Sequence, residues 1–255
     1  MESDDPILKV ENISKTFGGI KAVDGATLSI QRGSITGLIG PNGSGKSTLF
    51  NIISGTESKF GGKVFFEGQM INGMPPHRIF ELGLGRTFQI PRLFTGMTVL
   101  ENAMLGGKKQ QGEDPLAAPF PQRWESGEME LARKAKDQLT ALEISQLYTK
   151  LSSEISGGQM KLLQLANALA GEPKMLLLDE PTAGVAPRLA QDIFESIKKL
   201  SEDKGTTFFI IEHRLEILFK HVEKVFVMHQ GQIIAAGSPV EIVKDAKVIE
   251  AYLGA

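Results

Sequence analysis

This sequence of 255 residues lacks several features, and each absence excludes some kinds of protein or site. It contains no cysteine, which excludes disulfides and thiolate metal sites and agrees with a reducing compartment. No apolar run approaches the ~18 residues of a membrane-spanning helix, and the segment Met1–Pro6 is acidic where a signal peptide is basic. If the protein works at a membrane, we therefore expect another chain to hold it there.

A large excess of either charge is also missing. Lys and Arg number 28 against 30 Asp and Glu, which gives a formal net charge of -2. This balance creates no strong overall field toward nucleic acid or anionic lipid, and we expect no nucleic-acid partner. Hydrophobic residues make up 41% of the chain, enough for a proper core, and the length suits one large α/β domain or two small ones.

The N-terminal part of the chain contains short alternating segments broken by turns, which predict antiparallel strands. One turn falls at Gly18-Gly19 and a second at Glu67-Gly68. The predicted strands beside these turns cover Leu8–Val10, Ala26–Ile30, residues 62–66 and residues 69–71.

Strands and helices alternate in the rest of the chain. The apolar run Ile35–Ile39 predicts a strand, after which a Gly-rich loop leads into a helix over Lys46–Ile53. Between two predicted helices, Val99–Leu105 and Met129–Leu147, we expect an exposed insertion over Gly106–Gly127. The later elements are a helix at 158–169, a strand at 175–178, a helix at 188–200, strands at 206–211, 224–228 and 232–236, and a helical tail. This alternation predicts an α/β fold, with a parallel sheet covered by helices on both faces.

A phosphate-binding loop is predicted between the strand Ile35–Ile39 and the helix that follows it. The segment matches G-x-x-x-x-G-K-[ST] at every position. Its backbone N–H groups and helix N-terminus would surround phosphate oxygens, while Lys46 supplies a positive charge and the Ser47 hydroxyl a Mg²⁺ ligand. A Gly-rich turn with a chance lysine is the alternative, but the strand and the helix lie on the correct sides for the motif. The loop consists of Gly40, Pro41, Asn42, Gly43, Ser44, Gly45, Lys46, Ser47 and Thr48.

Two adjacent acids, Asp179 and Glu180, end the apolar strand Met175–Leu178. In doubly wound sheets, ligands bind at such strand ends. Side chains alternate along a strand, so one acid suits the Mg²⁺ shell and the other a water molecule. We assign Asp179 to the metal and Glu180 to the water that attacks the γ-phosphate. The alternative is a pair of solvated acids before Pro181.

A second helix start with phosphate-binding potential follows Ile155. Ser156 is a plausible N-cap, and glycines at a helix start allow phosphate oxygens to approach its N–H groups. On chemistry alone, the alternative of an ordinary capped helix is favoured. The segment consists of Ser156, Gly157, Gly158 and Gln159.

Together, the three motifs resemble ABC transporter ATPases in their order and approximate spacing. The resemblance implies a single domain over 1–255 with a P-loop (RecA-like) parallel-sheet core that binds and hydrolyses ATP with Mg²⁺. It implies an antiparallel β subdomain from residues 1–33 and 56–72, and a helical subdomain over 90–165. In this family the Ser-Gly-Gly-Gln segment completes the ATP site of the opposite subunit, which implies a head-to-tail dimer with a second ATPase subunit.

Three other residues acquire roles through this resemblance. Gln89 resembles the glutamine that senses Mg²⁺ and water, although by chemistry alone it is only a polar residue. His213 resembles the switch histidine that contacts the γ-phosphate, where a satisfied strand-end histidine is the alternative. Phe17 resembles the aromatic residue that stacks on adenine, where a core phenylalanine is the alternative.

Local phrases resemble, more narrowly, the ATP-binding subunits (G type) of branched-chain amino acid importers. They are Arg86-Thr87-Phe88-Gln89, Ile211-Glu212-His213 and Ala251-Tyr252-Leu253-Gly254, with the long insertion before Trp124. This similarity implies a transmembrane permease docked near the Gln89 loop, a solute-binding protein as an indirect partner, and a position at the cytoplasmic face of the membrane. It leaves open whether the ATPase dimer is homomeric or heteromeric.

Three positions depart from the commonest pattern of the family, namely Ile155, Ala186 and Arg214. Leucine is usual at the first of these positions and aspartate at the other two. Ala186 matters most, because the usual aspartate reaches across the dimer and its absence puts the coupling of the two sites in doubt.

Alternatives to an amino acid importer remain within and beyond transport. A lipid or lipopolysaccharide transporter uses similar ATPase subunits, and only the attached permease distinguishes it. A soluble ABC ATPase acting on nucleic acid or ribosomes usually carries a long coiled coil or two tandem units, for which 255 residues leave no room. An adaptor that binds ATP without hydrolysis is disfavoured by the presence of Lys46, Asp179, Glu180 and His213.

Overall fold

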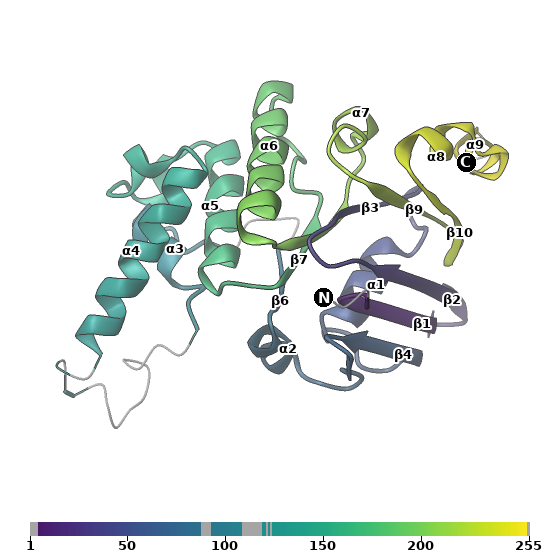
Figure 1. Cartoon of the computed structure of the whole chain (residues 1–255), viewed down its shortest axis with the longest axis horizontal. Helices are drawn as coiled ribbons and strands as arrows, with labels where there is room; N and C mark the ends of the chain where they lie inside the picture. The colour runs from purple at the N-terminus through teal and green to yellow at the C-terminus, as the bar shows by residue number, and fades with distance from the viewer. Residues whose placement is uncertain (1–4, 88–92, 109–118, 121, 123, 254–255) are drawn as a thin grey trace.

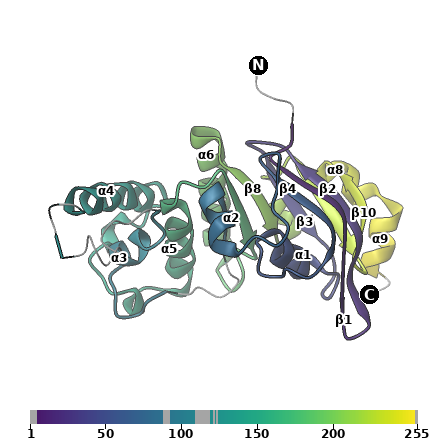
Figure 2. The same ribbon diagram turned by 90° about the horizontal axis from the view of Figure 1, so that it is seen from below.

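A computed structural model of the chain describes residues 5–87, 93–108, 119–120, 122 and 124–253. Figure 1 shows the helices α3, α4 and α5 gathered at one end and the strands β1, β2 and β4 toward the other, with the strands β6, β7 and β3 between them. Figure 2 shows the same separation from a second direction. No helix in the described ranges is both long and apolar enough to cross a membrane.

Four strands form a small antiparallel sheet in the order β2-β1-β4-β5. The turn predicted at Gly18-Gly19 joins the first two strands, and both glycines have positive φ angles of 51° and 89°. The second predicted turn, at Glu67-Gly68, joins the other two. These strands are β1 (Leu8–Phe17), β2 (Ile20–Ile30), β4 (Gly61–Phe66) and β5 (Gln69–Met70).

A six-stranded sheet in the order β10-β9-β3-β8-β7-β6 forms the core. All of its neighbouring strands are parallel except β9 and β10, which pair as an antiparallel hairpin. The predicted α/β class is confirmed, but the edge strand β6 was not predicted because its three residues, Leu-Gly-Arg, show no strand pattern. The strands are β3 (Ile35–Ile39), β6 (Leu84–Arg86), β7 (Met175–Asp179), β8 (Thr207–Ile211), β9 (Lys224–His229) and β10 (Gln232–Gly237).

Alternate side chains of the core strands face two separate hydrophobic layers. On β7, Leu176 and Leu178 pack into the layer with α5 and α6, whereas Met175 and Leu177 pack against α1 and the antiparallel sheet. Figure 1 shows α6 on one side of the core sheet and α1 with β1, β2 and β4 on the other. Because both faces are covered, the parallel strands are almost uniformly apolar and leave their carboxyl ends for polar residues. The helices around the core are α1 (Lys46–Ile53), α2 (Pro76–Leu82), α6 (Pro187–Lys204), α7 (Leu215–Leu218), α8 (Pro239–Lys244) and α9 (Ala246–Leu253).

The helical region contains α3 (Val99–Met104), α4 (Glu125–Ala141) and α5 (Gly157–Ala170), which contact one another. The predicted helix over Met129–Leu147 is wrong at both ends. It begins earlier and stops at Ala141, because Glu143 takes a left-handed φ of 57° and the chain continues as short 3₁₀ turns at Ser145–Leu147 and Ser152–Glu154. Of the insertion expected over Gly106–Gly127, residues 109–118, 121 and 123 lie outside the described residues, and its last residues already belong to α4.

Candidate functional site

The glycine-rich loop between β3 and α1 packs tightly against two neighbouring strands. A Cβ atom added to Gly40 would lie 2.0 Å from the carbonyl oxygen of Met228 on β9, and one added to Gly45 would lie 2.2 Å from that of Ala22 on β2. Both glycines also have positive φ angles, 151° and 104°. The loop therefore needs glycine at both positions, since any side chain would push it off the strands.

Helix α1 starts at this loop without a side-chain cap from any described residue, and its first turn holds no acidic residue. Free N–H groups and the positive end of the helix dipole favour an anion at such a position. The Lys46 ammonium lies inside the loop and donates hydrogen bonds of 2.8 Å to the carbonyl oxygens of both Gly40 and Pro41. The start of α1 thus combines uncapped N–H groups with a buried positive charge.

A cavity of about 200 Å³ opens over the loop and brings predicted residues from distant parts of the chain together. Burial lowers the pKa of Lys46, while the nearby Glu180 and Asp179 oppose that shift. The cavity therefore places an acid from the end of β7 and a histidine from the end of β8 opposite the phosphate loop. Its lining consists of Ala22, Asn42, Gly43, Ser44, Gly45, Lys46, Ser47, Thr48, Glu180 and His213.

Asp179 ends β7 in a buried position and is paired with an arginine that the sequence analysis did not assign to the site. Arg86, the last residue of β6, donates from Nη2 to Asp179 Oδ2 at 3.1 Å and from Nη1 to Asn51 Oδ1 at 2.7 Å. Burial raises the pKa of Asp179, and the positive charge of Arg86 offsets only part of this effect. A further cation near this carboxylate would therefore stabilise its charged form.

Glu180 and His213 lie in contact at the wall of the cavity. Nε2 of His213 lies 3.0 Å from Oε1 of Glu180, with the imidazole the more exposed of the two side chains. Glu180 has a left-handed φ of 49°, and its N–H donates to the carbonyl oxygen of Ile211 at 2.9 Å. Glu180 lines the cavity beside His213, whereas Asp179 is paired with Arg86 and is not among the described lining, so the two adjacent acids occupy different environments.

The segment Ser156–Gln159 begins α5 outside this cavity. Ser156 Oγ accepts from the Gln159 N–H at 3.3 Å, and Gln159 Oε1 accepts from the Ser156 N–H at 2.9 Å, which forms a reciprocal capping box. A Cβ atom on Gly158 would lie 2.0 Å from Cδ2 of Leu189, so this glycine allows α5 to approach α6. None of the four residues is among the described residues that line the loop cavity. Within one chain, the start of α5 therefore contributes nothing to the described lining of the cavity over the loop.

The roles predicted for Phe17 and Gln89 stay predictions. Phe17 lies at the tip of the β1–β2 hairpin and is 48% exposed, with the Lys15 ammonium 4.6 Å from the centre of its ring. It is not among the described residues lining the cavity, so its stacking on adenine stays a prediction. Gln89 lies outside the described residues, and its role stays a prediction as well.

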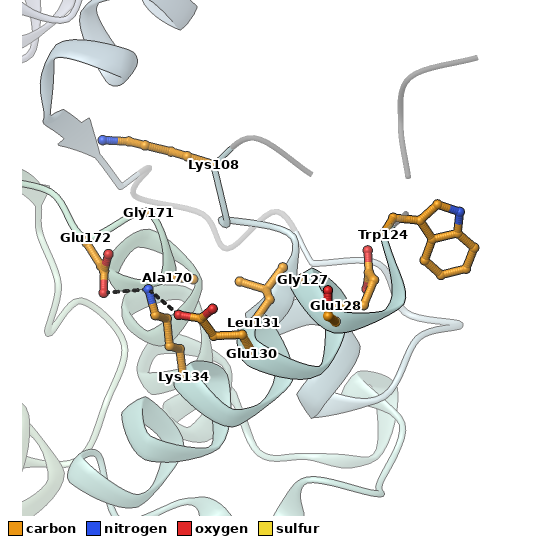
Figure 3. A pocket seen from close by; sticks show the side chains of 11 residues that line it. Lys108, Trp124, Gly127, Glu128, Glu130, Leu131, Lys134, Ala170, Gly171 and Glu172 are labelled. Carbon is orange, nitrogen blue, oxygen red and sulfur yellow. Dashed lines mark ion pairs between the residues drawn. The ribbon is translucent and has the colours of Figure 1, made fainter. Parts of the chain in front are cut away.

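A second cavity, of about 310 Å³, lies in the helical region between the start of α4 and the end of α5 (Figure 3). Its central lysine is paired: Lys134 Nζ lies 3.1 Å from Glu172 and 3.5 Å from Glu130. No predicted site residue is among its described lining. This cavity is therefore separate from the phosphate loop.

Sequence reasoning missed two buried charged residues beside the site, Arg86 and Glu212. Both lie within phrases of the sequence analysis that assigned them no role, since Arg86 begins the phrase that ends in Gln89 and Glu212 directly precedes His213. An acid following an apolar strand was a detectable signal. Glu212 is only 3% exposed, and this burial depends on contacts with Thr182, a residue remote from it in sequence.

The chain matches two protein-family models. The model described as ABC transporter matches residues 23–183, which is more than half of the chain. A second model, described as Branched-chain amino acid ATP-binding cassette transporter, matches residues 232–255. The chain therefore belongs to the ABC transporter family and is an ATPase of that family.

Individual relatives extend this similarity over nearly the whole length. The chain is 46% identical over 252 residues, 97% of either protein, to a "Probable branched-chain amino acid transport ATP-binding protein LivG" from Methanocaldococcus jannaschii. It is also 46% identical to an ABC transporter cassette solved in its ADP conformation, with a TM-score of 0.85 over 98% of this chain and 99% of that one. A dimeric cassette bound to ADP and Pi is 25% identical, with a TM-score of 0.74 over 91% of this chain and 98% of the other.

The residues present fit a magnesium nucleotide. The uncapped start of α1, the buried Lys46 ammonium and the cavity above them suit the phosphates. The Ser47 hydroxyl and the Asp179 carboxylate are oxygen ligands of the kind that Mg²⁺ prefers. The raised pKa of Asp179 also marks a carboxylate that an added cation would stabilise.

Proposed function

We propose that the protein is the ATP-hydrolysing motor subunit of an importer for branched-chain amino acids. One observation carries the motor role: the phosphate loop, Glu180 and His213 line the same cavity. The substrate class is supported by the printed names of the LivG relative and of the model matching residues 232–255.

In this proposal the chain's own residues divide the work of hydrolysis. The loop N–H groups and Lys46 bind the β- and γ-phosphates, and Ser47, Asp179 and Gln89 hold Mg²⁺, which when bound offsets the phosphate charge. Glu180 orients the attacking water and accepts its proton as the bond from phosphorus to the leaving oxygen of ADP breaks. His213, within hydrogen-bond distance of Glu180, contacts the γ-phosphate.

A second ATPase subunit completes each site. In one chain Ser156–Gln159 lies outside the described lining of the cavity, and the positive end of the α5 dipole suits the phosphates of a facing subunit. ATP binding then closes a head-to-tail dimer and hydrolysis reopens it. We place the dimer at the cytoplasmic face of the membrane, attached to a permease near the Gln89 loop and served by a solute-binding protein on the far side.

Uptake measurements in cells test this function. Deleting the gene should abolish uptake of radiolabelled leucine, isoleucine and valine, and the wild-type gene should restore it. A gene carrying Lys46→Ala should not restore it, because the variant loses the charge that binds the phosphates. Unchanged uptake after deletion, with ATP hydrolysis by the purified transporter intact, would reject the amino acid substrate and leave the motor role in place.

A further inference from the structure

A buried carboxylate links the two segments that carry Glu180 and His213. Glu212 follows β8 directly and is 3% exposed. Its Oε1 accepts from the N–H of Thr182 at 3.0 Å and from the hydroxyl of the same residue. Its Oε2 accepts from the N–H groups of His213 at 2.7 Å and Arg214 at 3.1 Å. One side chain therefore joins the turn after β7 to the loop after β8.

Arg214 makes a second link between the same two segments. Its Nη2 donates to the carbonyl oxygen of Val185 at 2.7 Å. Its Nη1 is buried without a hydrogen-bond partner among the described residues, so the guanidinium is held here by one of its two terminal nitrogens. Ala186, the residue after Val185, is the N-cap of α6 and provides no side-chain hydrogen bond. Arg214 therefore holds the end of this turn at Val185, while Glu212 holds its beginning at Thr182.

We propose that Glu212 and Arg214 are positioning residues that fix His213 against Glu180. The inference rests on the proposed catalytic roles of Glu180 and His213. Neither Glu212 nor Arg214 lines the cavity in the described structure, so both act through the residues that they hold. Arg214 ties the turn ending at Ala186 to the histidine loop of the same chain. Arg214 thereby positions the turn that ends at Ala186. This turn has alanine, and no acidic side chain, at the position facing a second subunit in the proposed dimer.

The chemistry of the carboxylate explains why a neutral residue cannot replace it. Each Glu212 oxygen accepts two hydrogen bonds, and its four donors come from both segments. A glutamine of the same size has one acceptor oxygen and one NH₂ group, which would face N–H or O–H donors on one of the two sides. Glu212→Gln therefore detaches one segment while filling the same volume.

Steady-state ATP hydrolysis by the whole transporter, containing the full chain, tests the role of Glu212. We expect Glu212→Gln to lower kcat about tenfold with KM for ATP changed less than about twofold, because misplacing catalytic groups by a fraction of an ångström weakens chemistry more than binding. Glu241→Gln is the matched control. Glu241 accepts from the N–H and hydroxyl of Ser238 at 2.7 and 2.8 Å, outside the site, so its loss should leave kcat unchanged.

Two variants of Arg214 test the second link. Arg214→Lys should keep at least about half of kcat, because an ammonium also donates to the Val185 carbonyl, whereas Arg214→Ala should lose about tenfold. A wild-type kcat in Glu212→Gln or Arg214→Ala would overturn the proposal while ATP hydrolysis by the wild type stands. The proposal would also be overturned if Glu212→Gln and Glu241→Gln lost kcat only in proportion to their losses in Tm. The effect on kcat would then follow from stability and not from the position of His213. A wild-type transporter that hydrolyses no ATP would instead reject the proposed function, and the positioning roles with it.

Discussion

Lys46 carries its charge where solvent hardly reaches it. The residue is 6% exposed, and its ammonium is surrounded by the loop carbonyls and the Ser44 hydroxyl. These neutral acceptors replace water only in part, and burial consequently lowers the pKa of Lys46. Bound phosphates would favour the charged ammonium again, so nucleotide binding and protonation of Lys46 are coupled.

We expect ATP binding to take up a proton at alkaline pH. Above the lowered pKa of Lys46, part of the free protein lacks this proton, and binding restores it. Affinity should therefore fall as pH rises, starting below the ordinary lysine value of 10.5. Calorimetry in two buffers of different ionisation enthalpy, at neutral pH and at alkaline pH just below 10.5, measures this uptake. Lys46→Arg, which stays charged, should bind without it. Binding by the wild type without proton uptake at the higher pH would contradict the coupling.

Three chain segments that are remote in sequence meet at Glu67, which lies in the turn between β4 and β5. Its carboxylate pairs with Arg32, which precedes β3, and with Lys174, which precedes β7. Burial raises the pKa of Glu67, but hydrogen bonds and charge from Lys174 and Arg32 lower it more, and the net pKa lies below the ordinary 4.5. These ion pairs fasten the antiparallel sheet to the segments that lead into the core strands β3 and β7.

Glu67→Gln should lower the free energy of unfolding at pH 7 by about 1 kcal/mol. Because the folded-state pKa is depressed, the stabilising contribution is present above the ordinary value of 4.5 and is lost as pH falls through the folded value. The difference from wild type should therefore shrink below about pH 4. Urea unfolding at several pH values measures it. Glu81→Gln, which removes an exposed pair with Arg78, should change stability by less than about 0.5 kcal/mol. A pH-independent difference for Glu67→Gln would show that charge is not its source.

The two helix starts that the sequence predicts to bind phosphate do not share a cavity within one chain. The phosphate loop opens into its cavity, whereas the start of α5 lies outside the described lining of that cavity. The related cassette bound to ADP and Pi is dimeric. A second subunit, facing in the opposite direction, would bring the start of its α5 to this loop.

Glu180→Gln should lower ATP hydrolysis at least about 100-fold while leaving ATP binding intact. Glutamine keeps the size of the side chain but cannot accept the proton of the attacking water. The variant should therefore accumulate as an ATP-bound dimer with a second ATPase subunit, which analytical ultracentrifugation with Mg-ATP detects. Adding Lys46→Ala should return it to monomers. Normal hydrolysis by Glu180→Gln would show that Glu180 is not the base.

Much of the site could be predicted because its motifs are continuous in sequence. The loop at Gly40–Thr48, the strand before Asp179 and the capped start of α5 each need particular residue types at fixed spacing, and the structure has these elements where they were expected. The limits of the helix expected at Met129–Leu147 were wrong, since the left-handed Glu143 stops α4 early and no glycine or proline marks the place.

The α/β class, the phosphate loop and the acids at the end of β7 could be predicted from the sequence, because local backbone geometry and strand periodicity require particular residues at those positions. Which charges meet around them depends on the tertiary fold. Arg86 and Asp179 are 93 residues apart in sequence, and Thr182 and Glu212 are 30 apart. Such pairs form where the carboxyl ends of neighbouring parallel strands converge, and that order of strands in the sheet is set by packing over the whole chain rather than by any local pattern.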